Sequence, residues 1–265
     1  MAEPGAMLEN SLIVAAHPDD EMLWFGAVLP KVHEVIIVFE DFWPDPAMGP
    51  ARADALSNFP RENVSSLKLA EAASYGCADW ANPQISPWGI ELTKTCEIRD
   101  AKQKAKRLVG KSNAPVEGIR AVYKSNFETL VDQLRPKLNP QMNVFTHNPW
   151  GEYGHEDHVL VFRALDLLCE EIGFTLWMSN YCTERTVTLA KTYFDNETRL
   201  MIELPVDKVF CDKVADVYRQ AGCWTWSDEW TWFDTEFYME APRKQVFSKT
   251  QAHLIPLNFF NIDPN

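Results

Sequence analysis

The stretch "LIVAAHPDDEMLW", residues 12–24, joins a short apolar run directly to a group of ionisable side chains. The run over residues 11–16 predicts a strand that is buried on both faces, and residues 21–33 predict a helix with apolar side chains on one face. Carboxylates crowded this closely repel one another unless a positive charge lies among them. Either they fan out into water at the start of the helix, or they surround a cation. The residues concerned are His17, Asp19, Asp20 and Glu21.

The composition is typical of a globular protein and argues against some classes of partner. The chain has 265 residues, 46% hydrophobic and 24% charged, which is enough for one sizeable core. The formal net charge of −13 argues against binding to nucleic acid or to an anionic membrane, because phosphate groups need a basic surface. No stretch approaches the roughly 20 apolar residues that a membrane span requires.

The chain is expected to be cytoplasmic. Residues 1–10 carry two acidic residues and none of the basic residues that open a secretory signal. The 6 cysteines are scattered and none forms a Cys-x-x-Cys pair, so we predict that they are reduced.

Apolar segments alternate with amphipathic segments along most of the chain. Strands separated by helices imply parallel pairing with right-handed crossovers. The sequence therefore predicts an α/β fold, a Rossmann-like three-layer sandwich with a mostly parallel central sheet, forming a single domain over residues 1–265. The predicted strands are residues 11–16, 35–39, 142–147 and 174–179, and the predicted helices are residues 21–33, 64–75, 119–134 and 158–172.

Three other segments carry weaker patterns. Residues 40–63 are rich in proline, aspartate and aromatic residues, and predict a long functional loop. The stretch "RDAKQKAKR", residues 99–107, predicts a solvated helix face. The tryptophan-rich residues 224–238 alternate like a strand face and favour a half-buried hairpin, although one or two rings could still reach a ligand.

A second polar cluster, "THNPWGEYGHEDH" at residues 146–158, follows the predicted strand 142–147. In open parallel sheets the ligands bind beyond the carboxyl ends of the strands, which is where both clusters fall. The first turn lacks the glycines that a dinucleotide site needs, so a nucleotide is disfavoured. Nitrogen and carboxylate ligands together suit zinc, and a catalytic zinc keeps three protein ligands. The sequence therefore predicts a catalytic metal site at this edge.

Two motifs carry a resemblance to a known family. "AHPDDE", residues 16–21, followed by "GEYGHEDH", residues 151–158, resembles the LmbE-like, or PIG-L, family of zinc-dependent N-deacetylases, which act on N-acetylglucosaminyl compounds. The later stretch "LPVDKVFCDKVADVYRQAG" is similar to the strand and helix that follow in this family, so the likeness spans most of residues 11–225. The resemblance implies hydrolysis of the N-acetyl group of an amino sugar or its conjugate, a small-molecule substrate.

The resemblance also implies a role for each matching residue. The expected metal ligands are His17, Asp20 and His158, with Zn²⁺ as the metal and Fe²⁺ as the other candidate. The expected catalytic residues are Asp19 as general base, His155 as transition-state stabiliser or proton donor, Asp157 as its neighbour and Tyr153 as a carbonyl-polarising group, with Glu21 in support.

Physical chemistry agrees with the role of the base. Zinc lowers the pKa of bound water to about 7 and polarises an amide oxygen. Asp19 cannot easily bind the same ion as the adjacent Asp20, so it is left to accept the proton of water. A carboxylate such as Asp157 could keep His155 protonated and able to donate.

The substrate-binding half of the resemblance is incomplete. The family commonly carries an arginine and a glutamate early in a helix, and the aligned positions here are Val64 and Leu67. The candidate substrate-binding residues are therefore Arg61, which could replace the missing arginine, together with Trp43, Trp150 and His147.

Three functions remain open on these residues. The first is a metal-dependent N-deacetylase for an amino sugar or its conjugate. The second is a related amide hydrolase for another acyl group or a non-sugar amine, which is favoured if Arg61 and Glu62 point away from the site. The third is a non-catalytic protein that binds a sugar or a nucleotide.

Overall fold

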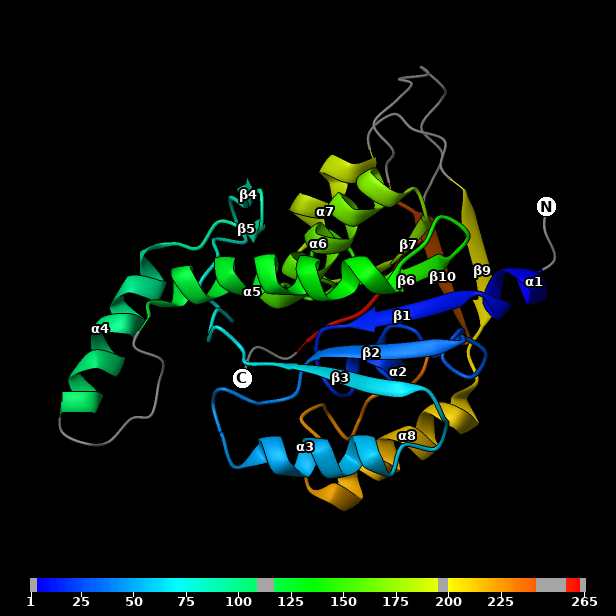
Figure 1. Ribbon diagram of the computed structural model, residues 1–265, viewed down its shortest axis with the longest axis horizontal. Helices are drawn as coiled ribbons and strands as arrows, with labels where there is room; N and C mark the ends of the chain where they lie inside the picture. The colour runs from blue at the N-terminus through cyan, green and yellow to red at the C-terminus, as the bar shows by residue number, and fades with distance from the viewer. Residues whose placement is uncertain (1–3, 109–116, 195–199, 242–255, 263–265) are drawn as a thin grey trace.

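The computed structural model describes residues 4–108, 117–194, 200–241 and 256–262. At its centre is a seven-stranded sheet with the order β3-β2-β1-β6-β7-β10-β9 (Figure 1). The strands from β3 to β7 in this order pair in parallel, and β10 runs antiparallel to both of its neighbours. The strands are β1 (Ser11–Ala15), β2 (Glu34–Phe39), β3 (Val64–Leu69), β6 (Asn143–Thr146), β7 (Thr175–Ser179), β9 (Met201–Pro205) and β10 (Thr235–Glu240).

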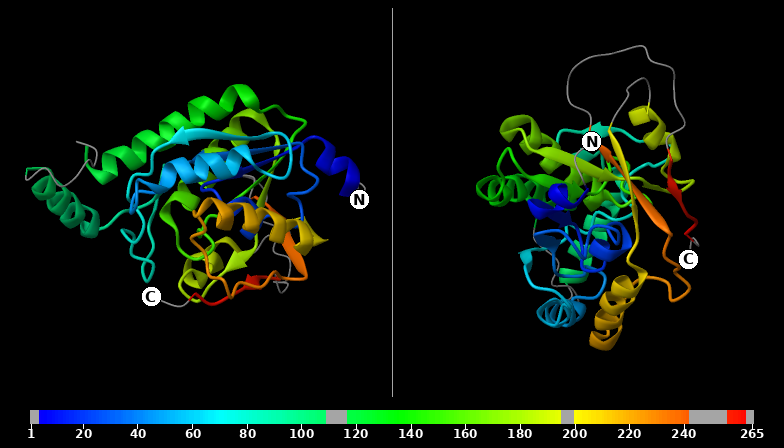
Figure 2. Two further views of the ribbon diagram at one scale, coloured as in Figure 1. Left: turned by 90° about the horizontal axis from the view of Figure 1, so that it is seen from below. Right: turned by 90° about the vertical axis from the view of Figure 1, so that its right-hand side faces the viewer.

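Helices cover both faces of this sheet. Side chains alternate across a strand, so Leu12 and Val14 of β1 face one helix layer while Ile13 and Ala15 face the other. The first layer contains α5 and α6, and the second contains α2, α3 and α8, with α3 and α8 side by side (Figure 2). The predicted three-layer α/β fold with a mostly parallel sheet is confirmed. The helices are α1 (Pro4–Glu9), α2 (Asp20–Leu23), α3 (Met48–Ser57), α4 (Lys94–Leu108), α5 (Ile119–Leu134), α6 (Glu156–Ile172), α7 (Val187–Phe194), α8 (Lys208–Ala221) and the 3₁₀ turn η1 (Arg135–Lys137).

Two short pairs of strands complete the fold. A small hairpin joins β4 (Ile85–Ser86) to β5 (Gly89–Ile90), and β8 (Tyr181–Cys182) pairs in parallel with β11 (Asn258–Phe259). Among the helices in the described ranges, none is both long enough and apolar enough to cross a bilayer.

Most predicted elements are confirmed by the structure. The strands predicted from residues 11–16, 35–39, 142–147 and 174–179 correspond to β1, β2, β6 and β7, and the helices predicted from residues 119–134 and 158–172 correspond to α5 and α6. The charged stretch 99–107 lies in α4, and residues 204–222 hold the end of β9 and the whole of α8.

The helix predicted for residues 21–33 is wrong beyond its first turn, because α2 ends at Leu23. The backbone N–H groups of Gly26 and Ala27 donate to the carboxylate of Glu236, at 3.1 and 2.9 Å, instead of to helix carbonyls. Gly26 also lies so close to α8 that a Cβ atom there would come within 2.7 Å of Cys211 Sγ. The segment is therefore folded into turns by contacts with two distant elements.

Three further predictions are corrected. The helix predicted for residues 64–75 is wrong, because residues 64–69 form β3 at the edge of the sheet, where pairing with β2 overrides local helix propensity. The loop predicted for residues 40–63 contains the helix α3. Arg52 and Ala55 are the only residues of α3 that are buried, so the helix has no clear apolar face in the sequence. The hairpin predicted for residues 224–238 is an irregular segment followed by β10, because its tryptophan rings pack on one another.

Candidate active site

The site lies where the connections of the sheet change direction. From β1 the chain passes to β2 and β3 on one side, and later returns to β6 on the other side of β1. Side chains that follow β1 and β6 therefore meet at the carboxyl ends of two adjacent strands, the usual position of a ligand in such sheets. His17 follows β1, and the loop that leads to α6 follows β6.

The turn after β1 is held tightly by its own side chains. Asp20 Oδ2 accepts the backbone N–H of His17 at 2.8 Å, and Asp20 Oδ1 accepts the indole N–H of Trp24 at 2.7 Å. Asp19 has a positive φ of 105°, which few residues other than glycine adopt. These contacts fix the carboxylate of Asp20 in one orientation.

The crowding of three carboxylates is not relieved by water, because Asp19, Asp20 and Glu21 are all buried. Burial raises the pKa of Glu21 to about 8, and its two oxygens accept the Tyr218 hydroxyl at 2.8 Å and the Asp19 backbone N–H at 3.0 Å. Burial, with the charge of Asp20, also raises the pKa of Asp19 to about 6. Asp20 is the exception, because the nearby histidines overcome its burial and hold its pKa well below its usual range.

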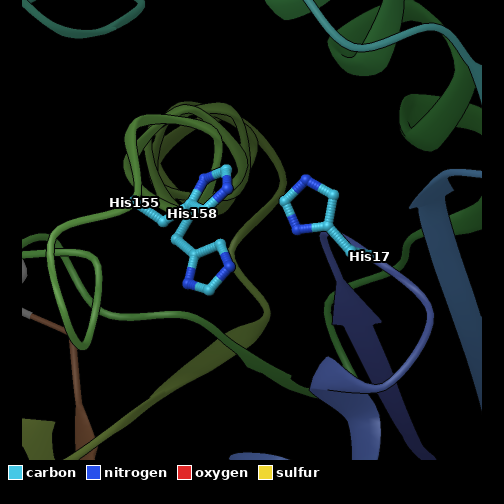
Figure 3. A group of neighbouring side chains, drawn as sticks. All are labelled: His17, His155 and His158. Atoms are coloured by element: carbon cyan, nitrogen blue, oxygen red, sulfur yellow. The ribbon is translucent and has the colours of Figure 1, made fainter. Parts of the chain in front are cut away.

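The three predicted metal ligands are brought together. Asp20 Oδ2 lies 3.1 Å from His17 Nδ1 and 3.2 Å from His158 Nε2. Figure 3 shows His17 facing His158 and His155 across the gap between the β1 turn and the start of α6. His158 is fully buried, and its Nε2 has no hydrogen-bond partner within the described ranges. Ring nitrogens of His17 and His158 therefore both lie within 3.2 Å of one oxygen of Asp20.

The geometry alone allows two overlapping metal-binding groups, with ligand atoms within 4.8 Å of one another. One group is His17, His155 and His158, and the other is Asp20, His147 and His158. The hydrogen-bond partner of each ring nitrogen distinguishes them, because a ligating nitrogen must offer a lone pair and a nitrogen that accepts a hydrogen bond has already used it.

His147 is excluded as a metal ligand by its own contacts. Its Nε2 accepts the backbone N–H of Ala16 at 2.8 Å, and its Nδ1 lies 3.1 Å from the carboxylate of Glu152. Both ring nitrogens are therefore engaged, and burial lowers its pKa, which keeps the ring neutral. The ring packs face to face on His158 at a centroid distance of 3.8 Å.

His155 has the opposite arrangement to that of His158. It caps α6, and its Nδ1 accepts the backbone N–H of Asp157 at 3.2 Å. Burial and the neighbouring charges of His17 and His158 hold its pKa well below the usual value. The neutral ring must then carry its proton on Nε2, so that His155 offers an N–H donor.

Glu152 was missed as a site residue, although it stands inside the quoted motif "GEYGHEDH". Its Oε2 lies 2.7 Å from His158 Nδ1, and its Oε1 accepts the Ser179 hydroxyl at 2.6 Å. Burial would raise its pKa, but His147 and His158 lower it to about 2. No spacing rule identifies such a residue, since only the folded loop turns it beneath the histidines.

Asp157 contacts a different histidine from the predicted one. Its Oδ1 accepts the Ser74 hydroxyl at 2.8 Å, and its Oδ2 lies 3.5 Å from His17 Nε2. Asp157 and Asp20 overcome the effect of burial and raise the pKa of His17 to about 10. The expected support of His155 by the Asp157 carboxylate is therefore corrected, because this carboxylate faces His17.

A buried ion pair on α3 and after β3 was also missed. Glu71 Oε1 lies 3.6 Å from His17 Nε2 and 3.6 Å from Arg52 Nη1. Arg52 is only 2% exposed, and it also donates to the backbone carbonyl of Asp41. The sequence had predicted a loop where α3 lies, so it did not single out Arg52.

The tryptophan-rich segment contacts the site through its first residues. The Thr225 hydroxyl donates to Asp19 Oδ2 at 2.8 Å, across 206 residues of sequence. The ring of Trp226 packs at 5.2 Å from Tyr153 and 5.4 Å from Trp24, measured between centroids. Trp226, the residue after Thr225, therefore joins aromatic rings of three distant segments into one cluster.

Of the four predicted substrate-binding residues, Trp43 lies at the edge of the cluster and His147 packs against His158 within it. The backbone N–H of Trp43 donates to Glu71 Oε2 at 3.2 Å, and its half-buried ring lies under the guanidinium of Arg99. The prediction for Arg61 is corrected, because its guanidinium binds the backbone carbonyls of Leu29 and Val32.

Trp150 and His147 are corrected in the same way. Trp150 is fully buried, and its indole N–H donates to the carbonyl of Tyr181 at 2.7 Å, so its ring belongs to the core. His147 is fully buried under His158 and bonded at both ring nitrogens.

Comparison with known proteins gives one informative match. The chain is 22% identical over 205 residues to 1D-myo-inositol 2-acetamido-2-deoxy-alpha-D-glucopyranoside deacetylase of Saccharomonospora viridis, which covers 74% of this chain and 72% of the relative. No protein-family model matches the chain, and no solved structure does. The chain is thus similar to a deacetylase, and it has a buried histidine–carboxylate cluster that could bind a metal.

Proposed function

We propose that the chain is a metal-dependent N-deacetylase of the LmbE-like, or PIG-L, type, which removes the acetyl group from an N-acetylated amino sugar or its conjugate. The observation that carries the proposal is the convergence of His17, Asp20 and His158, in a chain similar to a deacetylase of an acetamido sugar. The products are acetate and a free amine.

The residues present fit a divalent ion such as zinc or ferrous iron. Two imidazole nitrogens and one carboxylate oxygen are the donor set that such ions accept. The buried, unpartnered Nε2 of His158 faces Asp20 Oδ2, and two acceptors at this distance repel unless a cation or a proton lies between them. A bound ion would lower the pKa of a water molecule and polarise the amide oxygen.

Asp19 is the proposed general base. Its Oδ2 is held by Thr225, which leaves Oδ1 to accept the proton of the attacking water. Its backbone N–H is tied to Glu21, so the carboxylate is fixed at both ends of the residue. Because Asp20 is committed to His17 and Trp24, the two adjacent aspartates have separate roles.

His155 and Tyr153 are the proposed hydrogen-bond donors. The N–H on Nε2 of His155 can stabilise the oxygen of the tetrahedral intermediate or donate to the departing nitrogen. Burial keeps the pKa of Tyr153 well above its usual value, so that its hydroxyl retains a proton for donation. Tyr153 lies beside both His155 and His158, with ring centroids 5.8 and 5.4 Å away.

Metal analysis and acetate release test the proposal together. We expect about one divalent ion per chain, and acetate release from at least one member of a panel of N-acetylated amino-sugar conjugates. Asp19→Asn should keep the ion but lose turnover by roughly a hundred- to ten-thousand-fold. Asp228→Asn, on a side chain that is 85% exposed, is the matched control and should keep both. Turnover in Asp19→Asn near that of the wild type would overturn the assignment of the base.

One observation favours a second candidate, a related amide hydrolase for another acyl group or a non-sugar amine. Arg61, which could have replaced the missing sugar-binding arginine, binds backbone carbonyls away from the cluster. The aromatic cluster of Trp24, Tyr153 and Trp226 would also suit an apolar group. Amine release from N-propionyl or N-benzoyl analogues that exceeds release from the N-acetyl compounds would favour this candidate.

A further inference from the structure

We propose that Glu152 is a positioning residue that fixes His158 in the tautomer able to bind a metal ion, and thereby sets the metal affinity of the site. This inference rests on the proposed metal-dependent function. A metal ligand is oriented by the group that its second ring nitrogen contacts, and such partners typically change metal affinity by 10- to 100-fold.

Each oxygen of the Glu152 carboxylate has two hydrogen-bonding partners. Its two oxygens contact four donors, two on each oxygen: His147 and His158 on Oε2, and the Asn148 backbone N–H and Ser179 hydroxyl on Oε1. The residue is fully buried, and three of its partners must donate to it: the Asn148 N–H, the Ser179 hydroxyl, and His147 Nδ1, because His147 Nε2 already accepts from Ala16. An anionic carboxylate only accepts, and therefore the nitrogen that faces it must carry the proton.

This requirement assigns the tautomers of two histidines at once. Glu152 requires a proton on His158 Nδ1, 2.7 Å away, so Nε2, which faces Asp20 at 3.2 Å, is the nitrogen at which a metal ion would replace a proton. His147 also carries its proton on Nδ1, and its Nε2 accepts the N–H of Ala16, the residue before His17. The Glu152 carboxylate thus holds the ring of His158, a proposed metal ligand on α6. Through His147 it also holds the backbone of Ala16, which precedes the proposed ligand His17.

The backbone conformation of Glu152 also supports a positioning role. Its φ is +50°, in the left-handed region that costs energy for residues other than glycine. The conformation is held by hydrogen bonds from its N–H to Asn148 Oδ1 at 3.0 Å and from the Thr186 hydroxyl to its carbonyl at 2.8 Å. A buried charge adds little to stability by itself, so a positioning role accounts better for both features.

The experiment compares two buried carboxylates. Zinc affinity is measured by competition with a chromophoric chelator for the full chain, for Glu152→Gln and for Glu236→Gln. Glu236 is the control because it is 1% exposed and accepts from Gly26, Ala27, Tyr181 and Tyr238, none of them a proposed ligand. We expect Glu152→Gln to weaken zinc binding by about 10- to 100-fold and Glu236→Gln to leave it unchanged. A zinc affinity of Glu152→Gln within twofold of the wild type would overturn the inference.

A second measurement does not depend on the folding of a variant. In the zinc-loaded wild type, ¹⁵N spectra of labelled histidines should show His158 protonated on Nδ1 and metal-bound through Nε2. Metal bound through Nδ1 of His158 would overturn the inference.

The two proposals fail in different ways. A wild type that binds zinc with the expected tautomer but hydrolyses no amide would overturn the proposed function alone. An active wild type in which Glu152→Gln binds zinc normally would overturn this inference alone. A wild type that binds no divalent ion would overturn both.

Discussion

Replacing His158 by alanine should abolish the stabilisation of the chain by zinc. His158 is fully buried, contributes one of the three proposed ligand atoms and donates to Glu152 at 2.7 Å. The substitution therefore has two separable effects. It weakens the fold even without metal, and it removes the metal-linked part of the stability.

The two effects have different expected sizes. Loss of one of four donors to a buried carboxylate costs about 1–3 kcal/mol, independent of zinc. At a free zinc concentration of about 100 times Kd, the wild type should gain about 2.7 kcal/mol. At about 2–4 °C per kcal/mol for a chain of this size, that gain raises Tm by about 5–10 °C. The variant should start from a lower Tm and gain almost nothing.

The assay is thermal unfolding with a chelator and with saturating zinc. His33→Ala is the matched control, because His33 is an exposed histidine outside the cluster, and this variant should keep the full zinc shift. A zinc shift of wild-type size in His158→Ala would refute the assignment of His158 as a ligand. It would leave His17, Asp20 and His155 as the remaining candidates for the ligand set.

Three further predictions concern the surroundings of the site. Gly151→Ala should lower the free energy of unfolding by about 1–3 kcal/mol more than Gly222→Ala, measured in urea. Both glycines have positive φ, but a Cβ atom would meet the His155 carbonyl at 2.6 Å only at Gly151. Thr225→Val should reduce kcat by about tenfold or more with unchanged zinc affinity, since it removes a hydrogen bond worth about 1.5–3 kcal/mol to the proposed base. Unchanged kcat would show that this bond does not serve the reaction. Arg61→Ala should leave KM unchanged while lowering stability, because its partners are backbone carbonyls, and a raised KM would restore it as a substrate residue.

The fold was predictable where local pattern and tertiary contacts agree. The continuous apolar run of β2 and the amphipathic pattern of α5 each determine their own element, and both predictions are confirmed. The pattern failed where distant groups decide the conformation. Gly26 and Ala27 leave the expected helix because Glu236, more than 200 residues away, accepts their N–H groups.

The missed helix α3 has a consequence for the site. Because this helix buries little more than Arg52 and Ala55, it shows no clear apolar face in the sequence. The arginine expected near the site was therefore sought at Arg61, whereas the buried guanidinium that contacts Glu71 belongs to Arg52. A charged residue buried by a tertiary ion pair gives no hydrophobic signal, and so sequence periodicity cannot locate it.

The histidine roles show most clearly what sequence can and cannot predict. Spacing placed His147, His155 and His158 at one edge of the sheet, and the structure confirms that they meet there. Their chemistry differs because each ring has a different partner at its other nitrogen. Ala16 occupies Nε2 of His147, the Asp157 backbone occupies Nδ1 of His155, and Glu152 faces Nδ1 of His158. In the proposed site the first ring is thereby closed to a metal, the second is the proposed proton donor and the third is the proposed ligand. Each of these partners is fixed only when the loop 148–155 folds against β1 and α6, so the division of roles is a property of the tertiary structure.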